Sequence, residues 1–166
     1  DVTGGTLQVS GRRAARDAVE QAAGRFLGPQ KQVPPMYSAV KVNGQKLYDL
    51  ARRGKAVERP ARDITVHAIE LLEFDEHAQK GMLRLTVSKG TYVRTLINDL
   101  GEALGTLAVM HSLTRTRSGA YTLRECRGFS QVERAAADGT AQALLLPTDS
   151  LFPLQPAVRL TDEGAE

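Results

Sequence analysis

The sequence contains no tryptophan, a single cysteine and few aromatic residues, with four tyrosines and four phenylalanines in 166 residues. One cysteine, Cys126, excludes an internal disulfide framework and a cysteine-rich zinc site, and it favours a reducing compartment. No apolar run approaches the roughly 20 residues that span a bilayer. Nothing near Asp1 has the basic start and apolar stretch of a signal peptide. We therefore expect a cytoplasmic protein with no membrane partner.

Several chemical motifs are also missing. The sequence has no Gly-x-x-x-x-Gly-Lys-Ser/Thr loop, no Gly-x-Gly-x-x-Gly loop, no His-Glu-x-x-His pair and no Gly-x-Ser-x-Gly elbow. The three histidines, His67, His77 and His111, are scattered and have no partner at the spacing of metal ligands. These absences argue against a metal site, a nucleotide-binding site and a hydrolase.

The composition that is present is typical of one globular domain. About 42% of the residues are apolar and 25% are charged, with a net charge of +3. A chain of this length and composition can bury a substantial core, so widespread disorder is not expected. The first residue is Asp1 rather than methionine, and we therefore expect the chain to be the remainder of a longer protein.

Hydrophobic periodicity predicts an alternation of helices and strands. The predicted helices cover 12–27, 47–53, 93–104 and 130–137, with Thr91 capping the third and a Ser130–Glu133 capping box opening the fourth. The predicted strands cover 36–42, 63–75 and 82–87, followed by a strand, turn and strand within 107–123. We expect an α/β (α+β) fold, with a mixed, largely antiparallel sheet flanked by helices.

The segment Ser88-Lys89-Gly90-Thr91-Tyr92-Val93-Arg94 lies where a predicted strand passes into a helix. A helix N-terminus attracts anions through its free N–H groups and its dipole. Arg94 in the first turn opposes that dipole, which indicates an anionic partner from elsewhere, either a carboxylate or a phosphate. The alternative is that Lys89 and Arg94 are solvated surface charges.

Positive charge is concentrated in two places. Residues 41–62 hold seven Lys and Arg against Asp49 and Glu58, a local net charge of +5, and a second group follows at 115–127. Excess positive charge interleaved with Tyr37 and Tyr48 suits a phosphate backbone and favours nucleic-acid binding. Basic surfaces of soluble proteins are also often merely solvated.

Two motifs carry a resemblance to a known family. Gln32-Val33-Pro34-Pro35-Met36-Tyr37-Ser38-Ala39-Val40-Lys41 and Ser88-Lys89-Gly90-Thr91-Tyr92-Val93-Arg94-Thr95-Leu96, followed by Asp99-Leu100-Gly101, resemble bacterial TruB, the tRNA pseudouridine-55 synthase family. The resemblance covers residues 32 to about 125. It implies a pseudouridine-synthase-like fold that converts one uridine in the tRNA T arm to pseudouridine, without a metal or an organic cofactor. The target base would be flipped out of the RNA.

The resemblance also assigns roles to individual residues. Arg94 matches the arginine that pairs with the catalytic aspartate, and Tyr92 matches a tyrosine lining the same pocket, so both are predicted catalytic residues. Leu113 matches an apolar residue beside the flipped base, and Lys89 matches a position near the pocket. The predicted substrate-binding residues are Leu113, Lys89, Lys41 and Arg115.

The sequence departs from the family pattern in one important respect. The family's catalytic aspartate lies in a Gly-x-Leu-Asp-Pro-type segment, and this chain contains no such segment. We therefore expect residues 1–150 to form the C-terminal part of the catalytic domain, inactive alone and requiring an upstream N-terminal portion. Residues 151–166 would be a linker or the start of a C-terminal RNA-binding domain. The alternative is an RNA-binding module without catalysis.

Overall fold

The computed structural model describes residues 2–152 and 155–156. The chain divides between Leu113 and Thr114 into two compact units, which are described separately below. The first unit contains, in chain order, α1 (Arg16–Gly24), β1 (Gly28–Gln32), β2 (Lys41–Val42), β3 (Gln45–Lys46), α2 (Leu47–Arg52), β4 (Arg62–Asp75), β5 (Lys80–Val87) and α3 (Val93–Leu104). The second unit contains β6 (Arg117–Ser118), β7 (Tyr121–Thr122), α4 (Phe129–Ala137) and the 3₁₀ turns η1 (Leu123–Glu125), η2 (Ala141–Leu144) and η3 (Thr148–Leu151).

The centre of the first unit is an antiparallel sheet with the strand order β1-β4-β5. β4 is the long central strand because β-branched and other apolar residues alternate along most of its length. Two register shifts against β5, between Val66 and Ala68 and between Leu71 and Glu73, each insert one extra β4 residue. Such bulges increase the local twist and bend the strand.

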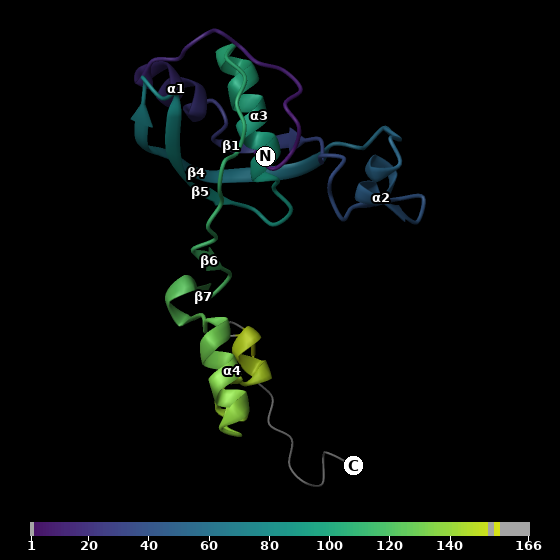
Figure 1. Ribbon diagram of the computed structural model, residues 1–166, viewed down its shortest axis with the longest axis vertical. Coiled ribbons are helices and arrows are strands. Elements are labelled where there is room, and N and C mark those ends of the chain that lie inside the picture. The colour runs from purple at the N-terminus through teal and green to yellow at the C-terminus, as the bar shows by residue number, and fades with distance from the viewer. Residues whose placement is uncertain (1, 153–154, 157–166) are drawn as a thin grey trace. The chain divides into compact units, whose positions relative to one another are not determined.

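Helices α1 and α3 pack together on one face of this sheet (Figure 1). Two small residues of α1, Ala22 and Ala23, pack against Leu100 of α3. Phe26, Ile69, Leu83 and Leu104 pack around this cluster from the helices and both strands. The apolar stripe of α3, with Leu96 and Leu100 buried, therefore places the start of this helix next to the sheet.

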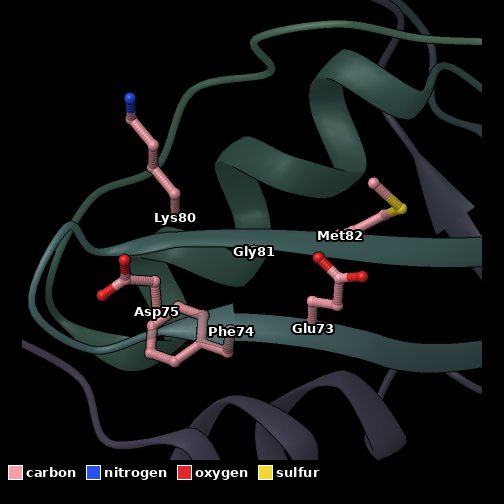
Figure 2. Close-up of a pocket in the computed structure, with 6 residues that line it drawn as sticks. All are labelled: Glu73, Phe74, Asp75, Lys80, Gly81 and Met82. Carbon is pink, nitrogen blue, oxygen red and sulfur yellow. The ribbon is translucent and has the colours of Figure 1, made fainter.

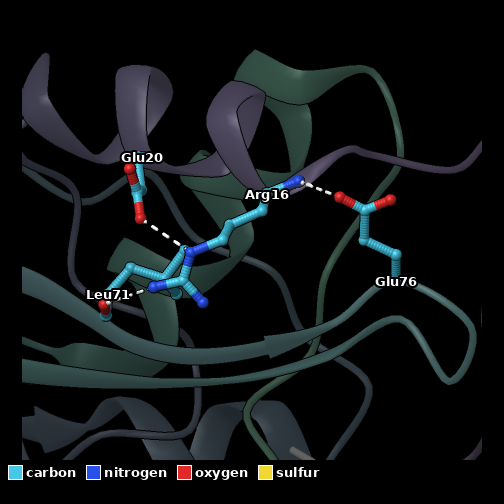
Figure 3. Close-up of polar contacts among 4 residues, drawn as sticks. All are labelled: Arg16, Glu20, Leu71 and Glu76. Atoms are coloured by element: carbon cyan, nitrogen blue, oxygen red, sulfur yellow. Dashed lines mark hydrogen bonds and ion pairs between the residues drawn. The ribbon is translucent and has the colours of Figure 1, made fainter.

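The start of α1 is held by the β4–β5 turn rather than by a cap of its own. Its N-cap, Ala15, makes no side-chain hydrogen bond. As Figure 3 shows, the backbone N–H of Arg16 donates to Glu76 Oε1 at 2.7 Å, and the guanidinium reaches both Glu20, at 3.0 Å, and the Leu71 carbonyl, at 3.3 Å. These bonds fasten the helix to the sheet.

The end of α3 is a close crossing of the chain over its own helix. Gly105 adopts a left-handed conformation with φ +66°, and the N–H groups of Thr106 and Leu107 then donate to the Gly101 carbonyl at 3.0 and 3.1 Å. A Cβ atom on Gly101 would lie 2.1 Å from the backbone nitrogen of Ala108. Position 101 therefore has room for glycine alone.

The second unit is a short hairpin followed by α4. Glu125 closes the hairpin, because its Oε2 accepts hydrogen bonds from the Thr122 N–H at 2.8 Å and from the Thr122 hydroxyl at 2.6 Å. Within the same unit, the Tyr121 hydroxyl lies 2.9 Å from Ser150 Oγ. The hairpin is thereby tied both to its following turn and to η3.

The bonds at Glu125 predict how this hairpin responds to acid. They hold the pKa of the Glu125 carboxyl below its ordinary value of 4.5, first through the Thr122 hydroxyl and then through the Thr122 N–H. A depressed pKa means that the stabilisation is present above pH 4.5 and is lost as the pH falls through the folded-state value. We expect Glu125→Gln to remove this pH dependence. NMR titration of the carboxyl measures it, and a pKa above 4.5 would contradict the contact.

The observed architecture confirms the predicted α/β fold with a largely antiparallel sheet flanked by helices. The predictions for α2, β4, β5 and α3 agree with the structure to within a few residues. None of the helices in the described part of the chain has the length and apolar character that crossing a membrane requires.

Other local predictions were wrong. The first helix is shorter than 12–27, and residues 28–32 form a strand, β1, that periodicity did not reveal. Of the predicted strand 36–42, only Lys41 and Val42 pair, and of 107–123 only the short hairpin 117–122 does. Thr91 does not cap α3, because the N-cap is Tyr92. The fourth helix begins at Phe129, where Gln131 accepts from the Gly128 N–H at 3.0 Å, in place of the Ser130–Glu133 box.

Candidate functional site

The structure brings together two stretches that the sequence singles out, residues 32–41 (the first motif segment) and residues 88–96 (the second motif segment). The first begins at the end of β1 and continues through Pro34 and Pro35, which keep the chain extended. The second leaves β5 and enters α3. Residues about 60 positions apart in the chain are therefore neighbours at the start of α3.

Gln32 makes the first connection between the two segments. Its side chain is buried, and its Oε1 accepts from the Tyr92 N–H at 2.8 Å while its Nε2 donates to the Tyr92 carbonyl at 3.1 Å. One carboxamide thus bonds both backbone polar groups of a single residue. Because Tyr92 is the N-cap of α3 and makes no side-chain cap bond, Gln32 satisfies a donor that the helix start would otherwise leave without a protein partner.

Arg94 makes the second connection. Its Nη2 donates to the backbone carbonyl of Tyr37 at 2.8 Å. Arg94 as a whole is half-buried in the first turn of α3, where the charge of its guanidinium opposes the helix dipole. The carbonyl dipole of Tyr37 offsets part of that cost. Arg94 and Tyr92, the two predicted catalytic residues, are therefore both fixed against the first motif segment.

The loop of the second motif segment is held to the sheet by Ser88. Its N–H donates to the Thr65 carbonyl and its Oγ accepts from the Thr65 N–H, each at 2.8 Å. Gly90 then takes a left-handed conformation with φ +87°, and the hydroxyl of Thr91 lies 3.4 Å from Ser88 Oγ. Lys89 stands exposed at the tip of this loop, within the same segment as Arg94.

Lys41 lies on a different feature, a basic pocket of about 310 Å³ formed by the β2–β3 hairpin and α2. The pocket is lined by Lys41, Gly44, Gln45, Lys46, Asp49 and Arg53. Next to it, the cations of Lys46 and Arg52 each lie 5.4 Å from the centroid of the Tyr48 ring. The hydrogen bond to the Tyr48 hydroxyl raises the pKa of Lys46 above its ordinary value of 10.5, so this cation stays charged.

Leu113 and Arg115 lie on opposite sides of the division between the two units. Both side chains are exposed, Leu113 by 56%. Their predicted places beside the flipped base and the RNA therefore stay predictions. On α3 itself, burial raises the pKa of Asp99 above its ordinary value of 3.8, although Asp99 lies more than one helical turn beyond Arg94.

A second pocket, of about 410 Å³, lies at the turn end of the β4–β5 hairpin (Figure 2). It is lined by Glu73, Phe74, Asp75, Lys80, Gly81 and Met82. None of the predicted site residues lines it. Among the described residues, no group of three or more His, Cys, Asp or Glu side chains could hold a metal ion.

Gln32 opens the first motif segment, but no local pattern predicts a role for it. The burial of Gln32 could not be predicted, because it is polar and lies just before Val33-Pro34-Pro35, outside any helical or alternating hydrophobic pattern. Its importance depends on a contact across about 60 residues, which local patterns do not encode.

Two family models match the chain in consecutive parts. The family model described as TruB family pseudouridylate synthase (N terminal domain) matches residues 1–93, and the model described as tRNA pseudouridylate synthase B C-terminal domain matches residues 94–153. The boundary between the two falls between Val93 and Arg94, inside the second motif segment.

Individual relatives agree as well. The chain is 48% identical over 160 residues to tRNA pseudouridine synthase B of Geobacillus kaustophilus, covering 93% of this chain and 56% of that protein. It is 43% identical over 168 residues to tRNA pseudouridine synthase B of Pseudomonas putida, covering 99% of this chain and 54% of that protein. The chain therefore spans about half the length of these relatives.

A solved structure shares the fold. A chain in the crystal structure of a Cbf5-Nop10-Gar1 complex superposes with a TM-score of 0.62 at 28% identity, covering 82% of this chain and 37% of that one. The family-model match extends over more than half of the 166 residues and includes the whole first motif segment. Together with the joined motif segments, these matches show that the chain belongs to the TruB family of pseudouridylate synthases.

Proposed function

We propose that this chain is part of a tRNA pseudouridine synthase that isomerises the uridine at position 55, in the T arm, to pseudouridine. The observation that carries the proposal is the joining of the two motif segments by the Gln32–Tyr92 and Arg94–Tyr37 hydrogen bonds. Family membership supports the reaction type. Residues 1–150 would form the C-terminal part of the catalytic domain, completed by an N-terminal portion that supplies the catalytic aspartate.

In this proposal, the residues of the chain position the reacting groups. The aspartate acts as nucleophile or base, and Arg94 binds and orients it, because a guanidinium fork matches a carboxylate. Tyr92 lines the pocket for the flipped base and Leu113 packs beside it. The bond between the sugar and the uracil nitrogen breaks, the base turns, and a bond to carbon 5 replaces it. The proton on carbon 5 leaves to solvent and the freed uracil nitrogen takes up a proton from solvent, so the composition is unchanged and the reaction is an isomerisation.

The test uses the full-length protein and a tRNA transcript labelled with tritium at carbon 5 of uridine. Release of about one tritium per tRNA, with the product mapped to the T arm, supports the proposal. A protein that binds the tRNA without releasing tritium would be an RNA-binding module instead.

We further propose that tRNA lies along the basic pocket and α2, in the cytoplasm. The support is local charge, since Lys41, Lys46 and Arg53 line a pocket in which Asp49 is the acidic residue. A basic surface that recognises the shape of RNA contacts mainly the phosphates of the RNA. Of the segment 151–166, proposed as a linker or the start of an RNA-binding domain, residues 153–154 and 157–166 lie outside the described residues.

Salt dependence tests this surface. We expect the logarithm of the tRNA association constant to fall linearly with the logarithm of salt concentration, because bound phosphates release counterions. Lys46→Gln should reduce the slope by about 0.7–0.9, the contribution of one phosphate contact. The matched control is Lys31→Gln on β1, whose cation pairs with Asp63 at 3.4 Å and should leave the slope unchanged. Equal slopes for both variants would place the RNA elsewhere.

A further inference from the structure

The same pattern of side-chain hydrogen bonds holds the starts of α1 and α3, the two longer helices of the first unit. Neither α1 nor α3 has a side-chain cap on its N-cap residue. In each case a glutamine from another element bonds both backbone groups of a residue at the helix start. Gln32 bonds Tyr92, and Gln79 bonds Ala14, accepting from its N–H at 2.8 Å and donating to its carbonyl at 2.9 Å.

The two glutamines differ in what they hold. Gln79 fixes the entry to α1, a helix that carries none of the predicted site residues. Gln32 fixes Tyr92 and, two residues later, the backbone that carries Arg94. Resting on the proposed function, we propose that Gln32 is a positioning residue for pseudouridine formation, which sets the places of Tyr92 and Arg94 relative to the first motif segment.

The geometry favours a positioning role because the two connections enclose a short, stiff piece of chain. Gln32 and Tyr37 are five residues apart, and Pro34 and Pro35 stand between them. Their partners, Tyr92 and Arg94, are two residues apart on α3 and its cap. A shift of the Tyr92 backbone would therefore move Arg94 relative to the Tyr37 carbonyl to which it donates.

The role also requires a carboxamide. Gln32 is 4% exposed, so an unmatched polar group there would be costly. A neutral amide supplies the donor and the acceptor at once, at the reach of a glutamine side chain. Methionine has a similar length and shape but makes neither bond. Glutamate keeps the acceptor but, when ionised, presents an oxygen to the Tyr92 carbonyl.

The experiment compares Gln32→Met with Gln79→Met in the full-length protein. Each variant loses a pair of side-chain hydrogen bonds to one backbone residue, and Gln79→Met also loses the bond to the Glu76 carbonyl, so both should lower the melting temperature. Only Gln32→Met should slow single-turnover tritium release, by about 10- to 100-fold, because small displacements of reacting groups have effects of this size. The tRNA Kd should stay within about twofold, and amide hydrogen exchange at Tyr92 should accelerate, because the backbone and not the RNA surface has changed.

Several results would overturn the proposal. Equal single-turnover rates in the two methionine variants would make Gln32 a merely structural residue. If Gln32→Met does not fold, Gln32→Glu takes its place, and a rate equal to that of Gln79→Met would have the same meaning. A wild type that releases no tritium contradicts the proposed function itself. Unchanged exchange at Tyr92 in Gln32→Met, by contrast, contradicts the hydrogen bonds between Gln32 and Tyr92 whether or not the protein is active.

Discussion

The full-length protein carrying Arg94→Lys is expected to form pseudouridine at least about 100-fold more slowly than the wild type in a single turnover, a loss of about 2.7 kcal/mol of transition-state stabilisation. A guanidinium has five N–H donors in a rigid plane, so it can serve a backbone carbonyl and a carboxylate together. The structure shows the first of these, the bond from Nη2 to the Tyr37 carbonyl at 2.8 Å. Lysine, with one nitrogen on a flexible stem, cannot hold both in fixed geometry.

The control for this prediction is Arg84→Lys. Arg84 pairs with Glu70 at 3.0 Å on the exposed face of the sheet, where an ion pair contributes little. Its replacement should leave tritium release unchanged. If Arg94→Lys reacts within about threefold of the wild type, Arg94 does not orient the catalytic carboxylate.

The second large effect is expected at Gly101. Gly101→Ala should lower the free energy of unfolding by about 3 kcal/mol, because overpacking that the backbone cannot relieve has effects of this order. The added Cβ would lie 2.1 Å from the Ala108 nitrogen and 2.4 Å from the Leu107 carbonyl carbon, which are backbone atoms. Leu107 already has a positive φ of +59°, so the crossing chain has little freedom to move away. Urea unfolding followed by circular dichroism measures the change.

Gly24→Ala is the matched control. Gly24 is the last residue of α1, and a Cβ atom there meets nothing within 4 Å. Alanine should stabilise the protein by about 0.5–1 kcal/mol, since glycine has more freedom to lose on folding. Gly101→Ala and Gly24→Ala should therefore change stability in opposite directions. Stabilisation by both would mean that residues 106–108 do not cross α3 closely.

The elements that the sequence predicts well are those whose periodicity reflects burial. α3 shows a helical stripe ending at Leu104 and Gly105, and its core residues Leu96 and Leu100 are buried. β4 and β5 alternate because one face packs against the helices and the other meets solvent. In these segments, the local pattern and the tertiary environment agree.

The prediction of β1 failed because the strand carries almost no apolar signal. Its sequence, Gly-Pro-Gln-Lys-Gln, is that of a loop, and it pairs because β4 offers an edge and α1 delivers the chain beside it. The prediction of the helix caps failed for a related reason. The residues at the N-caps of α1 and α3 are Ala15 and Tyr92, so the groups that satisfy them come from distant segments.

For the candidate site, the sequence predicts residues but not the contacts that they make. The charge conflict at Arg94 indicated an anionic partner from elsewhere, either a carboxylate or a phosphate. The structure shows a bond to a neutral acceptor, the Tyr37 carbonyl, so the anionic partner stays a prediction. No local pattern predicts that the two motif segments are neighbours. Gln32, which joins them, could be recognised only once the fold placed β1 beside α3.

Gln32 binds residue 92 through backbone N–H and C=O groups, which every amino acid except proline has. Neither of these two hydrogen bonds involves the Tyr92 ring. Any residue except proline, which lacks the N–H, can therefore make both backbone hydrogen bonds at position 92. A substitution at Tyr92 should therefore remove what the ring contributes to the reaction without detaching the start of α3 from Gln32.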